Sequence, residues 1–332
     1  MNMDLNPIQF SRRRFLAGAA LLAAGAAQTS RAAAWPDGKA ITWVVPYPAG
    51  GSTDVLGRAI AQQLNTLLKT TVIVDNRPGA TGTIGAARVA RAEPDGLTVL
   101  GTSIGPQAVA PHMMGKLTYD PVEDFAAVIT VGTIPHVLVV GKHQPYTSVQ
   151  ALVEAARAKP DSIAYASGGT GTVLHVQGEL LKQKTATRFI HVPYKGDTPA
   201  LQDTLGEQVQ FMFAPIAAAL PHIQSGNLRA LAVTSGQRLK TLPDIPTMDE
   251  SGFDDFVVEQ WQAVFAPAGT PAPIIQQLNT AIASALQTPA LTELADKLGI
   301  TLVGGSPEAL DKMRRADYVK WGRVIRDAGI TA

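Results

Sequence analysis

Short apolar runs rich in β-branched residues alternate with longer runs of helical periodicity from residue 41 onward. Residues 41–47 (ITWVVPY) are typical of a strand, and valine, leucine and isoleucine then recur at helical spacing between residues 55 and 68. A strand that pairs in parallel with the next one needs a crossover of a dozen or more residues, most often a helix. The alternation therefore predicts an α/β protein in which helices flank mixed, mostly parallel sheets.

The same periodicities predict further elements along the chain. Strands are expected at residues 71–74, 97–100, 137–140, 163–166, 190–194, 209–213, 229–234 and 262–265. Helices are expected at residues 82–92, 148–158, 271–286, 289–298 and 307–327, the last three with proline at or near their starts.

The length of the chain indicates two lobes. It has 332 residues, more than the ~100–200 of a usual single domain. Residues 125–141 and 233–266 are strand-like but interrupted by glycine and proline, as expected where the chain passes from one lobe to the other. We expect a discontinuous first lobe, residues 35–134 plus 236–332, with a second lobe, residues 135–235, inserted into it.

The first 34 residues have the three parts of an export signal. Three arginines at 12–14 precede an apolar run, residues 15–27, and the small residues 32–34 follow. The apolar run is too short to span ~30 Å of hydrocarbon, which excludes a transmembrane helix. The arginine pair followed by Phe-Leu favours the twin-arginine type, with an ordinary secretory signal as the alternative. We expect export from the cytoplasm and cleavage near Ala34.

The charge balance argues against nucleic acid as a partner. The chain has 28 Lys and Arg against 27 Asp and Glu, and cleavage after Ala34 would remove four arginines and one aspartate. A mature chain of net charge −2 has no basic surplus to neutralise a phosphate backbone. The absence of cysteine excludes disulfides, thiolate metal sites and cysteine nucleophiles.

Two glycine-rich loops repeat one pattern. Residues 50–56 (GGSTDVL) follow the first strand, and residues 168–174 (GGTGTVL) follow a strand of the expected second lobe. Glycine lets the backbone approach a ligand, and a helix N-terminus presents unpaired N–H groups with partial positive charge. Each loop alone is also explained as a tight turn before a capped helix, but the pair predicts a clamp for an organic anion. The candidate residues are Gly50, Gly51, Ser52, Thr53, Asp54, Ser167, Gly168, Gly169, Thr170, Gly171 and Thr172.

Four residues, Asp54 among them, have competing interpretations. Asp54 would repel an anion, so we expect it to cap the helix or to bind a ligand hydroxyl. Lys195 is the nearest candidate cation, although a solvated lysine is equally consistent. His175 is a minor candidate, with a packed or capping histidine as the alternative. Ser103, at the end of a predicted strand, is expected to line the cleft as a hydroxyl donor.

An esterase is the alternative function. Residues 101–105 match G-x-S-x-G, and Asp197 and His222 follow in the order that a Ser103 triad requires, but no oxyanion segment of the His-Gly-Gly type is present. The glycines at 79–85 lack the G-x-G-x-x-G spacing of nucleotide sites, and the six histidines lack metal-site spacing. We therefore expect no cofactor, no metal and no enzymatic activity.

Several segments, taken in order, resemble the tripartite tricarboxylate transporter receptor family, also called the Bordetella uptake gene family. They cover most of the mature chain: VVPYPAGGSTD (44–54), VDNRPGATGTIGAARVARAEPDGLTVL (74–100), YDPVEDFAAV (119–128), ASGGTGTVLH (166–175), VPYKGDTPAL (192–201) and RALAVTSGQRLKTLPDIPTMDESGF (229–253).

The resemblance implies a periplasmic receptor with a two-lobe, type II periplasmic-binding-protein (Venus flytrap) fold. Such a receptor closes on a small organic carboxylate and delivers it to a membrane permease, and we expect it to be a monomer. The family's carboxylate-gripping loops match residues 47–54 and 167–172, which adds Tyr47 and Ala49 to the candidates. The sequence departs from the family at Ala214, where many relatives have an acidic residue, so an amino-acid ligand is disfavoured. The identity of the carboxylate stays open.

Overall fold

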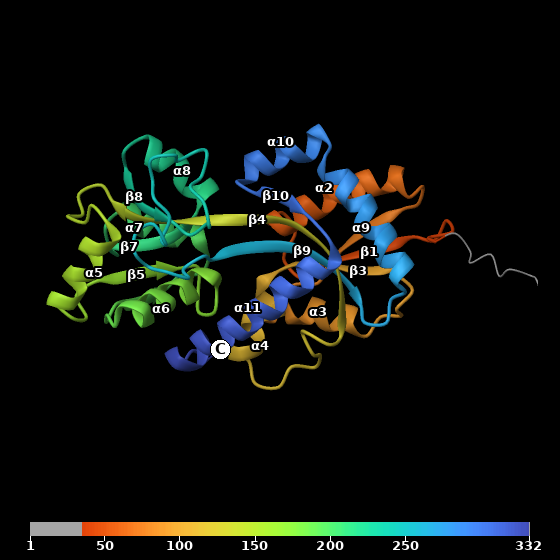
Figure 1. Ribbon diagram of the computed structural model, residues 1–332, viewed down its shortest axis with the longest axis horizontal. Coiled ribbons are helices and arrows are strands. Elements are labelled where there is room, and N and C mark those ends of the chain that lie inside the picture. The colour runs from red at the N-terminus through yellow and green to blue at the C-terminus, as the bar shows by residue number, and fades with distance from the viewer. Residues whose placement is uncertain (1–34, 332) are drawn as a thin grey trace, which may run out of the picture.

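The computed structural model describes residues 35–331 as two lobes side by side, joined by two long strands (Figure 1). The predicted export signal, residues 1–34, lies outside the described residues. Within the described part of the chain, no helix is both long and apolar enough to cross a membrane. The predicted α/β, two-lobe architecture is confirmed.

The first lobe is built on three parallel strands in the order β2-β1-β3. Buried Trp43 of β1 packs against Gly57 and Gly101, where a Cβ would overlap its indole ring, so α2 and β3 both lie close to β1. A left-handed turn η1 precedes α3, and a π-helical turn η2 and a short helix follow β3. The bounds are β1 (Ile41–Val45), α2 (Ser52–Leu67), β2 (Val72–Asn76), η1 (Ala80–Gly82), α3 (Thr83–Ala90), β3 (Thr98–Ser103), η2 (Gly105–Val109) and α4 (Ala110–Met113).

The second lobe repeats the strand–loop–helix arrangement. Strand β5 pairs in parallel with β6 and β7. Tyr165 of β5 packs against Gly178 of α6, where a Cβ would overlap the tyrosine ring. The bounds are α5 (Val149–Ala158), β5 (Ala164–Ser167), α6 (Val173–Thr185), β6 (Ile190–Pro193), α7 (Asp197–Leu205), β7 (Phe211–Pro215), α8 (Ile216–Gln224) and β8 (Leu228–Val233).

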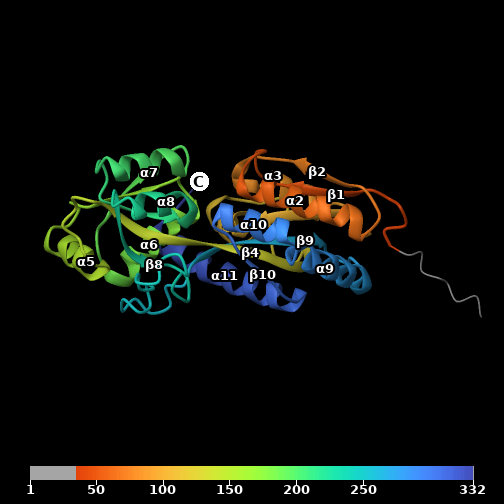
Figure 2. The same cartoon turned by 90° about the horizontal axis from the view of Figure 1, so that it is seen from above.

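Strands β4 (Phe125–Gly141) and β9 (Glu259–Pro267) connect the lobes. Residues 125–135 of β4 pair with β9, which in turn pairs with β3 of the first lobe. Residues 136–140 of β4 pair instead with β7 of the second lobe. Seen from above, the lobes lie at opposite ends of these two strands (Figure 2).

Residues 236–258, which the sequence assigned to the first lobe, pack against the second. Thr247 forms a β-bridge with Val233, and Ser251 accepts a hydrogen bond from Gln150 through its backbone carbonyl. The Val258 N–H donates to the Thr234 carbonyl, so the segment stays beside β8 until β9 begins. We propose a second lobe that extends from residue 136 to residue 258.

The C-terminal elements return to the first lobe and then run back along both. They are α9 (Ala272–Leu286), α10 (Pro289–Leu298), β10 (Thr301–Gly304) and α11 (Pro307–Ala328). Strand β10, which the sequence did not predict, pairs antiparallel with β4. Helix α11 lies across β4 and reaches α6, where Gln183 donates to the Val324 carbonyl (2.8 Å).

Candidate functional site

A cavity of about 380 Å³ opens between the two lobes. The first lobe contributes its glycine loop, the turn at Thr81 and the end of β3, and the second lobe contributes its glycine loop and the starts of α6 and α7. Strand β9 closes the cavity at Gln260. The lining residues are Tyr47, Pro48, Gly51, Ser52, Thr53, Thr81, Ser103, Gly105, Gly171, Thr172, Val173, Leu174, Asp197 and Gln260. We call this cavity the cleft.

The loop of the first lobe is fixed by Asp54, which is 2% exposed. Its carboxylate accepts hydrogen bonds from the Gly50 N–H (2.8 Å), from Arg58 Nε (3.1 Å) and from Asn76 Nδ2 (2.9 Å). Burial by itself raises the pKa of a carboxyl group, but these three donors and the Arg58 charge outweigh it and hold the Asp54 pKa below its ordinary value. Asp54 therefore closes the loop at the start of α2 and is absent from the cleft lining.

The start of α2 faces the cleft without a side-chain cap. Its N-cap residue is Gly51, and no side chain accepts a hydrogen bond from the first turn in the manner of a cap. The first N–H groups of a helix have no intrahelical partner. Ser52 and Thr53 line the cleft at this end, and the Thr53 hydroxyl donates to Gln262 Oε1 (2.8 Å). The first loop therefore offers backbone N–H groups and a helix N-terminus to the cleft.

The loop of the second lobe differs, because most of its donors already have partners. Thr172 caps α6 by accepting from the His175 N–H (3.4 Å), and its hydroxyl donates to the Gly169 carbonyl (2.8 Å). The Gly169 N–H donates to Ser167 Oγ (3.2 Å), and the Gly171 N–H donates to His175 Nδ1 (3.0 Å). The two loops are therefore alike in sequence but unequal as anion sites.

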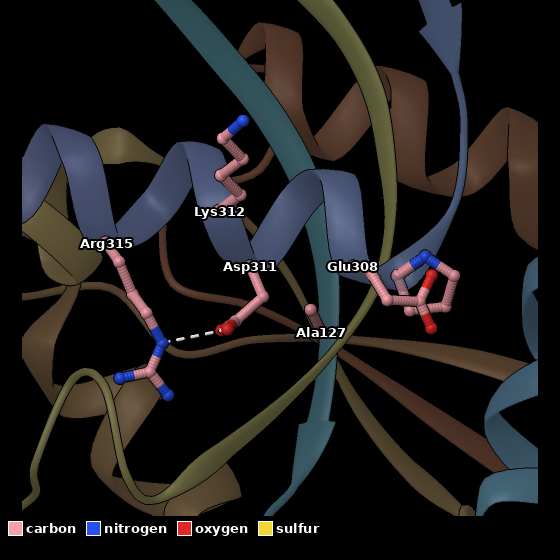
Figure 3. A pocket seen from close by; sticks show the side chains of 6 residues that line it. Ala127, Glu308, Asp311, Lys312 and Arg315 are labelled. Carbon is pink, nitrogen blue, oxygen red and sulfur yellow. Dashed lines mark hydrogen bonds and ion pairs between the residues drawn. The ribbon is translucent and has the colours of Figure 1, made fainter.

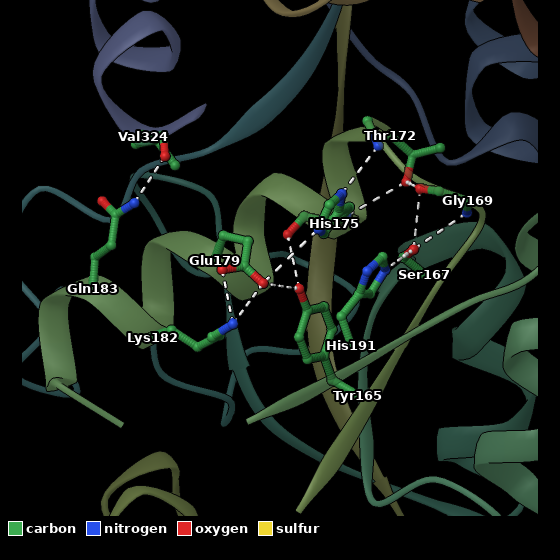
Figure 4. Close-up of polar contacts among 11 residues, drawn as sticks. Tyr165, Ser167, Gly169, Thr172, His175, Glu179, Lys182, Gln183, His191 and Val324 are labelled. Carbon is green, nitrogen blue, oxygen red and sulfur yellow. Dashed lines mark hydrogen bonds and ion pairs between the residues drawn. The ribbon is translucent and has the colours of Figure 1, made fainter. Parts of the chain in front are cut away.

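His175 supports this loop from behind and is absent from the cleft lining. Burial, together with the nearby Lys182 charge, lowers its pKa to about 4, so the ring is neutral at pH 7 and Nδ1 can accept from Gly171. Its ring stacks on His191 at 3.7 Å between centroids, and His191 Nε2 lies 2.7 Å from Ser167 Oγ (Figure 4). The packed-histidine interpretation fits these contacts.

A hydroxyl pair lies on the first-lobe side of the cleft. Tyr47 Oη and Ser103 Oγ are 2.7 Å apart, and burial raises the pKa of the tyrosine. Ser103 is the last residue of β3, and none of the cleft-lining residues is a histidine. The arrangement gives Ser103 a hydrogen-bond partner but no general base of the kind that an esterase triad requires.

The other predicted site residues lie off the cleft wall. Ala49, Gly50, Thr170 and Lys195 are exposed to solvent, and Ser167 and Ala214 are fully buried. Ala214 pairs with Val137 inside the sheet, so its side chain belongs to the core. Gly168 and Gly169 do not line the cleft, and their carbonyls accept hydrogen bonds from the Gly196 and Thr172 N–H groups.

The sequence did not single out several lining residues. Thr81 lies in the glycine-rich turn set aside as a nucleotide motif, and its positive φ of 54° marks that turn as unusual. Gln260 lies on the crossing strand β9, and Asp197 was considered only as a triad partner for Ser103. Asp197 follows the second-lobe strand β6 at the start of α7, the same position that each glycine loop occupies in its own strand–helix unit.

A second hollow, of about 540 Å³, lies beside α11 (Figure 3). Two of its four charged residues are in ion pairs: Arg315 Nε lies 2.8 Å from Asp311 Oδ2, and Arg315 also pairs with Glu123. It is lined by elements of one lobe and α11, so it lacks the two-sided enclosure of the cleft.

The cleft lies between two α/β lobes, and two crossing strands connect these lobes. This arrangement is that of a two-lobe solute-binding protein. The chain belongs to the tripartite tricarboxylate transporter family receptors, whose family pattern matches residues 56–330. The resemblance found in the sequence is thereby confirmed.

The relatives agree with this membership. BugT of Bordetella pertussis is 38% identical over 313 residues, 94% of this chain and 96% of BugT. The fold is similar to that of the periplasmic binding protein BugD, at 35% identity and a TM-score of 0.71 over 88% of this chain and 98% of BugD. It is similar to R. palustris Rpa4515 solved with adipate (34% identity, TM-score 0.75, 90% and 99% covered). It is also similar to Rhodopseudomonas palustris MatC with bound malate (31% identity, TM-score 0.72, 86% and 98% covered).

Proposed function

We propose that this protein is an extracytoplasmic receptor that captures a small organic carboxylate in the cleft. The observation that carries the proposal is the cleft itself, which both lobes line with backbone N–H groups, hydroxyl groups and one helix N-terminus without a side-chain cap. Hydrogen bonds to a charged acceptor contribute about 1.5–3 kcal/mol each. Four or five of them, reduced by the cost of association, are compatible with micromolar affinity and with release of the ligand.

The positions of the residues that line the cleft support the ligand-binding roles that we assign to them. The N–H groups at the start of α2, with Ser52 and Thr53, hold the carboxylate, and the Tyr47–Ser103 hydroxyl pair contacts it from β3. On the second lobe the hydrogen bonds come from the first turn of α6, while Gly171 and Thr172, whose N–H and hydroxyl groups already donate within the loop, pack against the ligand. Asp54, His175 and Ser167 act through the loops that they hold.

Location and partner rest on the sequence and on the family. The arginine-rich, apolar and small-residue segments at the N-terminus support export to the periplasm with cleavage near Ala34. Membership of the family supports delivery of the ligand to the permease of a tripartite tricarboxylate transporter. The protein acts as a binding protein without catalysis.

The first prediction tests the cleft with Gly51→Val. Gly51 has φ −72° and ψ 164°, an extended conformation that valine adopts readily, and a Cβ there would meet only the Pro48 carbonyl at 3.6 Å. The variant should fold normally but fill the space that the ligand carboxylate needs. We expect calorimetry to show loss of binding to any carboxylate that stabilises the wild type in a thermal-shift panel.

Gly115→Val is the matched control, because a Cβ at Gly115 meets nothing within 4 Å and Gly115 is absent from the cleft lining. It should bind like the wild type. Wild-type affinity in Gly51→Val would show that the ligand binds elsewhere.

A further inference from the structure

The cleft contains one charged side chain among its lining residues. Every other lining residue is glycine, proline, apolar, or a neutral hydroxyl or amide residue, and the exception is Asp197. Lys195, the candidate cation from the sequence, is exposed and off the cleft wall. A site for organic anions therefore has a carboxylate on its second-lobe wall and no cation to neutralise it.

Asp197 is held in place by the second glycine loop. The Tyr194 N–H donates to the Ser167 carbonyl (2.9 Å) and the Gly196 N–H donates to the Gly168 carbonyl (3.1 Å), which ties the start of α7 to that loop. A Cβ on Gly168 would overlap Asp197 Oδ1, so the carboxylate packs directly against this glycine and would have to move if residue 168 carried a side chain. The hydrogen bonds between the two loops and the packing against Gly168 therefore determine where Asp197 lies on this wall.

Within residues 35–331, the Asp197 carboxylate has no ion-pair partner. Asp197 is exposed at the cleft surface, but its pKa is raised above the ordinary value because the protein around the carboxylate reduces its hydration. Among the described residues, neither a hydrogen bond nor a nearby cation offsets this effect. Asp54, the other carboxylate near the cleft, differs because three donors satisfy it. An ionised carboxylate without hydrogen-bond donors is stabilised most by a ligand that supplies a donor. A second carboxylate close to it would be repelled.

We propose that Asp197 makes the receptor selective for carboxylates whose second polar group is a hydrogen-bond donor, a hydroxyl or an ammonium, over those that end in a second carboxylate. This inference rests on the proposed function and names the ligand class of the same site. Ala214 in place of an acidic residue led us to expect that an amino-acid ligand is disfavoured. Asp197 modifies that expectation, because it supplies the cleft with an acidic group.

Calorimetry with ligands matched in length tests the proposal. The probes are adipate, 6-hydroxyhexanoate and 6-aminohexanoate, and the shorter set succinate, 4-hydroxybutyrate and 4-aminobutyrate. We expect the wild type to bind the donor-terminated members at least roughly tenfold more tightly than the diacid of the same length, the effect of one charged hydrogen bond. Asp197→Asn should remove most of this preference by strengthening diacid binding and weakening ammonium binding.

Asp244→Asn is the control for net charge, because Asp244 is exposed and lies off the cleft. It should keep the wild-type preference. Gly168→Ala gives a second way to displace the Asp197 carboxylate and should act in the same direction as Asp197→Asn.

The outcomes separate this inference from the proposed function. Binding of both classes with the same ratio in wild type and Asp197→Asn, or a wild-type preference for the diacids, would overturn the inference and leave the receptor function standing. If no carboxylate in these sets or in the wider panel binds the wild type, the proposed function fails and the inference fails with it.

Discussion

At the scale of single residues, the histidines behind the second loop make stability depend on pH. Burial lowers the pKa of His175 and of His191 to about 4, and Lys182 and the neighbouring ring add to this effect. In the unfolded chain both groups have a pKa near 6.5, so between pH 6.5 and 4 the unfolded state binds more protons than the folded state. The stabilisation is present above about pH 6.5 and is lost as the pH falls toward 4.

We therefore predict that the free energy of unfolding falls between pH 7 and pH 4.5, as urea titrations would show. In the double variant His175→Asn/His191→Gln the fall should be shallower, because the amides keep acceptors near Nδ1 and Nε2 but do not titrate. Asp197 and Asp317 have raised pKa values, which make the folded state more stable as the pH falls. The test therefore compares the slope of unfolding free energy against pH in the double variant with the slope in the wild type. Identical slopes would show that these histidines do not determine the pH dependence.

At the scale of elements, the junction between β1 and α2 depends on Asp54. This carboxylate joins the Gly50 backbone, Arg58 of α2 and Asn76 of β2, so one side chain fixes the loop to two elements. Asp54→Ala should cost about 1–3 kcal/mol in unfolding free energy, because donors at a buried site lose their acceptor. It should also weaken ligand binding, since the N–H groups at the start of α2 are no longer held in place.

Asp54→Asn separates charge from shape. It keeps one acceptor oxygen but loses the ion pair with Arg58 (3.0 Å), so its stability should lie between those of the wild type and the alanine variant. An alanine variant with wild-type stability and wild-type affinity would contradict the role that we assign to Asp54.

Elements with strong periodicity could be predicted from the sequence, and those defined by long-range contacts could not. The apolar run before Pro46 gave β1, and Pro307 marked the start of α11. Strand β10 was missed because its four residues are partly exposed and pair only with a strand more than 160 residues earlier. The sequence-based boundary of the second lobe at residue 235 differs from the one that we propose, because no helix or strand lies within residues 236–258 to indicate where this segment packs.

The same limit applies to the site. The first loop could be recognised because its glycines and hydroxyls are adjacent in the sequence and all serve one helix start. The two loops appeared equivalent in sequence, and only the fold shows that His175 occupies the Gly171 N–H. Asp197 resembled an ordinary acidic residue in the first turn of a helix, and only packing against Gly168 places it on the cleft wall.

At the scale of the whole molecule, ligand binding is expected to bring the lobes together. Residues that line the cleft come from both lobes, and in the described part of the chain β4 and β9 connect the lobes while α11 lies along both. A ligand that contacts both walls makes more contacts when the walls approach each other. It therefore binds the closed arrangement more tightly than the open one and shifts the equilibrium toward closure. At about 100 times its dissociation constant it also stabilises the fold by about 2.7 kcal/mol.

The absence of cysteine makes this closure measurable, because two introduced cysteines would be the only sites for thiol-reactive dyes. Gln62 on α2 and Gln202 on α7 are exposed, and Figure 2 shows these helices in opposite lobes on the same side of the crossing strands. Energy transfer between dyes at Gln62→Cys and Gln202→Cys should rise when a carboxylate binds.

A pair at Gln62→Cys and Gln276→Cys, both exposed and both on the first lobe, should not respond. Gly51→Val in the same background should abolish the rise, because closure requires an occupied cleft. Binding by calorimetry without any change in energy transfer would mean that the ligand occupies a cleft whose lobes stay fixed.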